Sequence, residues 1–120
     1  MGLWMPLSRA HGKTPREPWQ YGDMALKEVK KWINFRHRLV PYLYHAACQS
    51  HQSGIPMIRP LVMEYPKDPI AKIQNLSYML GDALLISPGF DRDEYELYLP
   101  EGRWQDIESK EVLHVPAQLW

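Results

Sequence analysis

The sequence has 120 residues, enough for one domain with its own core, and its 45% hydrophobic and 23% charged residues are ordinary for a globular chain. Fourteen basic residues balance fourteen acidic ones, so the charge predicts neither nucleic acid nor an anionic membrane as a partner. The single cysteine, Cys48, excludes an internal disulfide and a cysteine-ligated zinc site, and no apolar run approaches the roughly 18 residues of a membrane span.

Residues 1–22 are irregular and contain the first candidate binding residues. Arg9 and His11 precede Gly12 in a stretch with neither helical nor strand periodicity. Imidazole and guanidinium groups donate hydrogen bonds to hydroxyls, and Trp19 offers a flat apolar surface nearby in sequence. These residue types predict either a loop that orients a polyhydroxylated ligand or a solvent-exposed leader to the helix that follows.

A long amphipathic helix is predicted from residue 24 to about residue 52. Asp23 is the expected N-cap, and Gly54 followed by proline predicts the C-terminal stop. Pro41 removes a backbone donor inside this pattern, so a kink or a break is expected there. Apolar residues at helical spacing fall close to one stripe, which Trp32, Leu39 and Ala46 widen: Leu26, Val29, Ile33, Val40, Leu43 and Ala47.

The second half of the chain predicts strands. Residues 55–66 are a short apolar run between prolines, typical of a buried strand, and the composition changes near residues 65–69. Further strands are expected at 78–90, 94–100 and 111–116, with turns at 101–104 and 108–111. The chain is therefore predicted to be α+β, and its first half is incomplete by itself, since one buried strand needs neighbours on both sides.

Motifs for other chemistries are absent. The sequence has no serine nucleophile elbow, no phosphate-binding glycine loop and no zinc-spaced cluster, so no metal site is expected. The remaining histidines are too scattered to form a ligand set and are predicted to lie at the surface or at an interface: His37, His45, His51 and His114. Four aspartates could supply acid and base groups, but none has an evident catalytic setting: Asp23, Asp82, Asp91 and Asp93.

Five stretches follow one another between about residues 7 and 105: "SRAHG", "EPWQYG", "RHRLVPYLYHAACQSHQSGIPMIRPLVMEYP", "YMLGDALLISP" and "YLPEGRW". In this order they resemble the C-terminal part of the catalytic region of glycoside hydrolase family 31, which includes α-glucosidases and α-xylosidases. The resemblance implies that residues 1–66 are the end of a TIM barrel, with the long helix and the last barrel strand. Residues 67–120 would then begin the antiparallel β-sandwich that follows.

The resemblance also implies roles for the residues before the helix. His11 matches the family histidine that hydrogen-bonds sugar hydroxyls in the cleavage subsite, Arg9 matches the arginine of the same motif, and Trp19 is a wall or loop anchor. The family uses retaining hydrolysis with two aspartates and no cofactor. Both aspartates lie upstream of the matched region, and "GDM" at residues 22–24 opens the helix and is not the nucleophile motif. No catalytic residue is assigned, and the chain is predicted to be inactive alone.

Other interpretations remain open. The 12% aromatic content and the self-contained appearance of residues 76–116, including Trp104, also suit a stand-alone carbohydrate-binding or interaction module. A third interpretation is self-association through the apolar face that a complete barrel would cover. The expected ligand is an α-linked glucoside or xyloside. Met1 is expected to start an incomplete gene, a misassigned reading frame or a shortened chain, and with no visible signal peptide the expected location is cytoplasmic.

Overall fold

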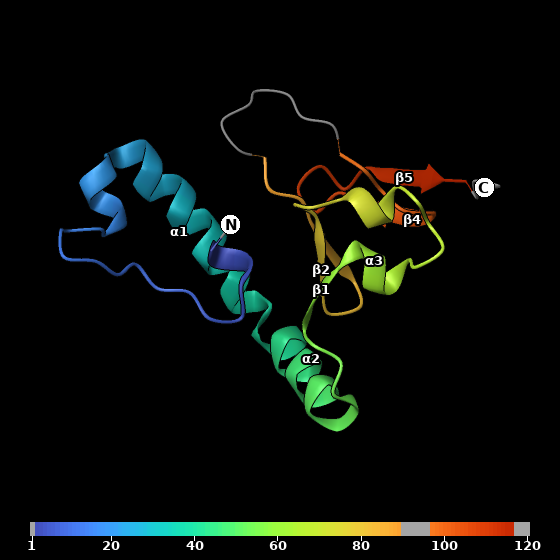
Figure 1. Ribbon diagram of the computed structural model, residues 1–120. Helices are drawn as coiled ribbons and strands as arrows, with labels where there is room; N and C mark the ends of the chain where they lie inside the picture. The colour runs from blue at the N-terminus through green and yellow to red at the C-terminus, as the bar shows by residue number, and fades with distance from the viewer. Residues whose placement is uncertain (1, 90–96, 117–120) are drawn as a thin grey trace. The chain divides into compact units, whose positions relative to one another are not determined.

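The computed structural model describes residues 2–89 and 97–116, and the chain divides into two compact units. The first unit contains the residues up to Ile58 together with Leu80–Leu84. The second contains Arg59–Met79 together with the residues from Leu85 onward. Figure 1 shows the two longer helices before residue 54 and the strands of the described part after residue 57, so the predicted α+β class is confirmed.

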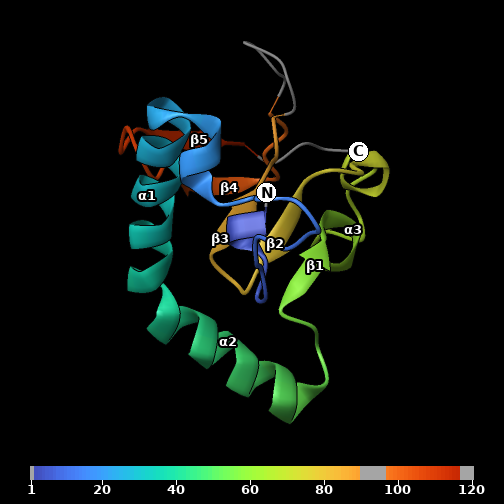
Figure 2. The same ribbon diagram turned by 90° about the vertical axis from the view of Figure 1, so that its left-hand side faces the viewer.

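The long helix of the first unit is two helices. α1 spans Asp23–Arg38 and α2 spans Val40–Ser53, and Figure 2 shows them meeting at an angle. The predicted break is confirmed: it falls at Leu39, which places Pro41 in the first turn of α2, where its missing N–H costs no helical hydrogen bond. Gly54 ends α2 in the left-handed conformation at φ 76°, as expected.

The expected N-cap of α1 is wrong by one residue. Asp23 is the first helical residue, where its carboxylate favours the positive end of the helix dipole, and Gly22 is the cap. Gly22 has φ 88°, a conformation that glycine adopts without steric cost. Two short 3₁₀ helices precede α1, η1 at Gly2–Trp4 and η2 at Pro18–Tyr21.

Five short strands form two sheets. The strands of the three-stranded sheet are β1, Ile58–Pro60, β2, Tyr78–Leu80, and β3, Leu84–Ile86. They lie in the order β1-β2-β3. The two-stranded sheet pairs β4, Gly102–Gln105, with β5, Val112–Val115, in an antiparallel register that sets Trp104 opposite Leu113. The strands predicted within 78–90 and 111–116 and the turn near 108–111 are confirmed.

The core of the second unit forms around Leu61, which is completely buried. Leu61 opens the one-turn helix α3, Leu61–Glu64, and packs with Met79 of β2 and with Ala71, the first residue of the 3₁₀ helix η3, Ala71–Ile73. Four partly buried residues cover this cluster: Tyr65, Leu85, Tyr98 and Trp104.

Three strand and turn predictions require correction. Residues 55–66 hold only the three strand residues of β1, because the chain turns helical directly after Pro60. The strand predicted at 94–100 is irregular over 97–100, and residues 94–96 lie outside the described part. Residues 102–104, expected in a turn, belong to β4. Half-buried Gly102 and Trp104 alternate there with exposed Arg103. Pairing with β5 overrides the turn preference of glycine.

Candidate functional site

The segment before the predicted binding loop is fixed to α1 by Arg36. One guanidinium nitrogen donates to the Leu3 carbonyl at 3.0 Å, and the other donates to the Pro6 carbonyl at 2.8 Å. The planar fork of arginine suits two acceptors at once, so a single side chain sets the position of residues 3–6. Two charge-assisted bonds from one rigid group make this the main polar anchor of the segment.

Aromatic packing supports the same segment. Trp4 meets Trp32 and Phe35 of α1 edge to face, with ring centroids 5.5 Å and 5.7 Å away. The two α1 rings also meet each other, at 6.0 Å. Such arrangements stabilise by about 0.5–1.5 kcal/mol per pair beyond the burial of their area. The loop that follows therefore begins from a fixed point on α1.

The far end of the loop is fixed by η2, directly before α1. Pro18 occupies the first turn, and the Gln20 N–H donates to the Glu17 carbonyl at 2.9 Å. Trp19 lies in this turn with 62% of its surface exposed, and Tyr21 is 64% exposed. The predicted role of Trp19 as an apolar wall is therefore compatible with its exposure.

Residues 7–16 join the two anchors, and all of them are exposed. Neither Arg9 nor His11 makes a hydrogen bond or an ion pair with any residue in the described ranges. A Cβ at position 12 would lie 2.0 Å from Nε of Arg16, so glycine leaves the room in which the Arg16 side chain folds back. The structure thus places Arg9 and His11 on one exposed loop and Trp19 at its end, and no direct contact joins the three within the described part.

Replacing Arg36 with alanine is expected to loosen the start of this loop. Both acceptor carbonyls lose their donor, so hydrogen exchange of the backbone amides in residues 3–7 should accelerate by about tenfold. Arg38→Ala is the matched control, because it removes a guanidinium from the same helix that lies over the Phe35 ring, 5.2 Å from its centroid, whereas the Leu3 and Pro6 carbonyls are bound by Arg36. Equal exchange in the wild type and in Arg36→Ala would contradict the anchoring role.

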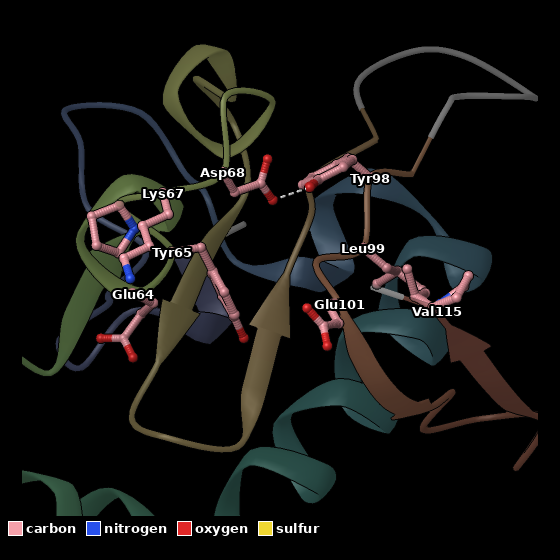
Figure 3. Close-up of a pocket in the computed structure, with 10 residues that line it drawn as sticks. Glu64, Tyr65, Lys67, Asp68, Tyr98, Leu99, Glu101 and Val115 are labelled. Atoms are coloured by element: carbon pink, nitrogen blue, oxygen red, sulfur yellow. Dashed lines mark hydrogen bonds between the residues drawn. The ribbon is translucent and has the colours of Figure 1, made fainter. Parts of the chain in front are cut away.

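A cavity of about 400 Å³ in the second unit is a second candidate site, and nothing in the sequence analysis pointed to it (Figure 3). Tyr98 and Asp68 face each other there, and the tyrosine hydroxyl donates to the Asp68 carboxylate. The other Asp68 oxygen accepts the N–H groups of Ile70 at 2.8 Å and Ala71 at 3.1 Å. The cavity is lined by residues 64–68, Tyr98, Leu99, Glu101, Val115 and Pro116.

Electrostatics fix the protonation of this pair. Burial raises the pKa of the Asp68 carboxyl, but the hydrogen bonds from Tyr98 and from the Ala71 and Ile70 amides outweigh burial and lower it overall. Burial, followed by the hydrogen bond and negative charge of Asp68, raises the pKa of Tyr98 from 10.0 to about 12. Burial, and to a lesser degree Glu64, raises the pKa of Tyr65. Asp68 is therefore a carboxylate at neutral pH, and both phenols are protonated.

Tyr98 is expected to ionise late in an alkaline titration followed by tyrosinate absorbance. Because its folded pKa of about 12 lies above the ordinary 10.0, its contribution to stability is complete below pH 10.0 and is lost as the pH rises to about 12. Asp68→Asn removes the negative charge that helps to keep the Tyr98 hydroxyl protonated, so the ionisation of Tyr98 should shift toward lower pH. Tyr98→Phe should remove this ionisation from the titration. A late step that Asp68→Asn leaves in place would contradict the assigned pair.

The other residues singled out in the sequence do not form a catalytic set in the described part. His37, His45, His51 and His114 are exposed, as predicted. Within residues 2–89 and 97–116, no three histidine, cysteine or acidic side chains come together as a metal site, and no described helix is both long and apolar enough to cross a membrane. Asp23 and Asp82 are exposed and do not line the cavity, and Asp91 and Asp93 lie outside the described residues.

Comparison with known proteins matches both halves of the chain to one family. The model described as "Glycosyl hydrolases family 31 TIM-barrel domain" matches residues 1–46, and that described as "Glycosyl hydrolase family 31 C-terminal domain" matches residues 54–119. The predicted order, a barrel end followed by the C-terminal domain, is confirmed. The predicted boundary between residues 66 and 67 stays a prediction.

Individual relatives agree with these matches. The chain is 35% identical to human neutral alpha-glucosidase AB over all of its own length and 14% of that protein. It is 33% identical to an alpha-xylosidase of Lactiplantibacillus pentosus, over 96% of the chain and 15% of that protein. A Flavobacterium johnsoniae GH31 dextranase complexed with glucose superposes with a TM-score of 0.85 at 34% identity, over 96% of the chain and 16% of the dextranase chain. The chain thus spans about a seventh of the length of these relatives, and it belongs to glycosyl hydrolase family 31.

Proposed function

We propose that this chain supplies one side of the sugar-binding site of a retaining α-glycosidase that acts on α-glucosides or α-xylosides. The observation that carries the proposal is the loop of residues 7–16, which Arg36 of α1 anchors at its start and η2 anchors at its end, and which leaves Arg9 and His11 exposed. A rigidly rooted loop with uncommitted donors can hold a ligand at a small cost in ordering. Family membership indicates that the ligand is an α-linked sugar.

The chemistry of the loop suits sugar hydroxyls. In its neutral form the His11 imidazole donates through one nitrogen and accepts through the other, so it can engage one hydroxyl or bridge two. Arg9 offers a fork of donors to hydroxyls or to the loop backbone, and Trp19 offers an apolar face. The proposed role of these three residues is binding and orientation of the sugar.

Bond cleavage is proposed to need groups from outside the 120 residues. Retaining hydrolysis uses two carboxyl groups about 5–5.5 Å apart, one as nucleophile and one as acid and then base. The family nucleophile motif does not occur in the sequence. We therefore assign no catalytic residue to this chain and propose that it binds sugar without hydrolysing it.

Titration of the ¹⁵N-labelled chain with methyl α-D-glucopyranoside and methyl α-D-xylopyranoside tests the proposed binding role. Amide shifts at residues 8–12 are expected, with millimolar dissociation, and His11→Ala should weaken binding at that loop by about two- to tenfold. His51→Ala is the matched control, because His51 is an exposed histidine near the end of α2. Shifts at residues 8–12 that are equal in His11→Ala and His51→Ala would contradict the assignment.

The stand-alone module is less well supported than the glycosidase part. Its aromatic candidate, Trp104, donates its indole N–H to the Pro100 carbonyl at 2.8 Å and packs against the Leu61 cluster. Trp104 is therefore a structural residue of the second unit and not an exposed stacking platform. Sugar binding that His11→Ala leaves intact and a Trp104 variant with retained fold abolishes would favour the module.

A further inference from the structure

The cavity of the second unit has two aromatic walls and an apolar end. The Tyr65 and Tyr98 rings line it together with Leu99 and Val115. Figure 3 shows the Tyr65 ring between the side chains of Glu64 and Glu101, with Tyr98 and Asp68 paired above it. Its volume of about 400 Å³ lies within the range of roughly 300–1,000 Å³ that small-molecule sites occupy.

Part of the polar lining is already committed to the fold. Both oxygens of Asp68 accept hydrogen bonds from within the chain, and Glu64 pairs with Arg59, which is only 6% exposed. These groups hold the walls in place, since the Asp68–Tyr98 bond joins two segments thirty residues apart. Asp68 already accepts three hydrogen bonds, and one carboxylate oxygen of Glu64 is taken up by Arg59.

Three polar groups in the cavity remain uncommitted. The Tyr65 hydroxyl, the Lys67 ammonium and the Glu101 carboxylate make no hydrogen bond with any residue that the structure describes. Together they offer donors from Lys67, acceptors from Glu101 and both from Tyr65. A ligand with several hydroxyl groups could therefore satisfy all three.

The charges around the cavity disfavour an anionic ligand. Lys67 and Glu101 carry opposite charges, and Arg59 forms an ion pair with Glu64. The Asp68 carboxylate accepts hydrogen bonds from the Tyr98 hydroxyl and from two backbone amides. The three carboxylates and two cations leave one net negative charge, part of which the hydrogen bonds to Asp68 disperse. The matching ligand has one apolar face for a tyrosine ring and neutral hydroxyls at its edge.

We propose that this cavity is a second binding site of the chain, and that its ligand is a single neutral pyranose ring. The ring would lie against Tyr65, with its hydroxyls on Tyr65, Lys67 and Glu101. The site shares no residue with the loop of residues 7–16, and the proposal does not depend on sugar binding by His11.

The test is a titration of the ¹⁵N-labelled full chain with methyl α-D-glucopyranoside, read at the backbone amides of residues 64–68 and 98–101 other than Pro66 and Pro100, which have no N–H. These amides should shift in the wild type and equally in His11→Ala. Tyr65→Phe removes only the hydroxyl, and Glu101→Ala shortens a side chain that is exposed, so we expect both variants to keep the fold. Each should weaken binding at this cavity by about two- to tenfold. Tyr44→Phe is the matched control, since Tyr44 is 72% exposed on α2, and it should leave the affinity unchanged.

Three results would overturn the proposal. The first is an absence of shifts at residues 64–68 and 98–101 in the wild type. The second is an unchanged affinity in both Tyr65→Phe and Glu101→Ala. The third is a preference of about tenfold or more for D-glucosamine or for α-D-glucose 1-phosphate, which would show that the cavity selects a charged ligand. Because loss of the shifts at residues 8–12 in His11→Ala reports only on the loop, failure of one site is distinguishable from failure of the other.

Discussion

Leu61→Ala is expected to lower the free energy of unfolding of the second unit by about 2–5 kcal/mol, the usual cost of emptying a fully buried leucine site. Leu61 is completely buried and contacts the other two buried members of its cluster, Ala71 and Met79. Neither neighbour can fill the space easily, because both are held by secondary structure, in η3 and in β2. Urea denaturation followed by the indole N–H resonance of Trp104 measures the change in this unit.

Met63→Ala is the control for this prediction. Met63 lies on the same one-turn helix but is 51% exposed, so its truncation removes little buried area and should cost about 1 kcal/mol or less. Equal losses in Leu61→Ala and Met63→Ala would show that the effect comes from α3 as a helix. The cluster around Leu61 would then not be the core of this unit.

Gly81→Ala should destabilise the first unit by about 2–4 kcal/mol, through two separate effects. Gly81 has φ 61°, which favours glycine, and a Cβ there would lie 2.3 Å from the Tyr42 hydroxyl oxygen. That hydroxyl donates to the Leu80 carbonyl at 2.6 Å and accepts the Ala83 N–H at 3.0 Å, so it cannot move without breaking both bonds. Thermal unfolding followed by far-ultraviolet circular dichroism reports the loss.

Gly54→Ala separates the two effects. Gly54 also has a positive φ, 76°, but a Cβ there would have no atom within 4 Å, so alanine brings only the backbone strain of about 1 kcal/mol. The difference between the two variants is the cost of displacing Tyr42. If both variants lost the same stability, the Tyr42 hydroxyl would not be the constraint on residue 81.

Local signals in the sequence were enough to predict α1 and α2, although not the one-turn helix α3. The spacing of apolar residues, Pro41 and Gly54 act within one or two turns, so α1, α2 and the break between them follow from neighbouring residues. The strands were less predictable because each is only three or four residues long. Residues 102–104 joined β4 because β5 pairs with them, and the sequence near Gly102 contains no sign of that distant partner.

The two candidate sites differ in the same way. The loop with Arg9 and His11 is contiguous, so its residue types could be weighed directly and matched to a family motif. The cavity of the second unit is built from three separate segments, residues 64–68, 98–101 and 115–116. Tyr98 stood in a predicted strand, and only the tertiary structure brings its hydroxyl to Asp68.

We propose that these 120 residues bind an α-linked sugar and do not cleave it. The most direct test is an assay of the purified chain, free of contaminating glycosidase, with 4-nitrophenyl α-D-glucopyranoside and 4-nitrophenyl α-D-xylopyranoside. We predict nitrophenol release no faster than in buffer, for the chain and for His11→Ala alike. Turnover by the wild-type chain that His11→Ala abolishes would contradict the proposal that the chain does not cleave the sugar, because it would place the reacting carboxylates within this chain.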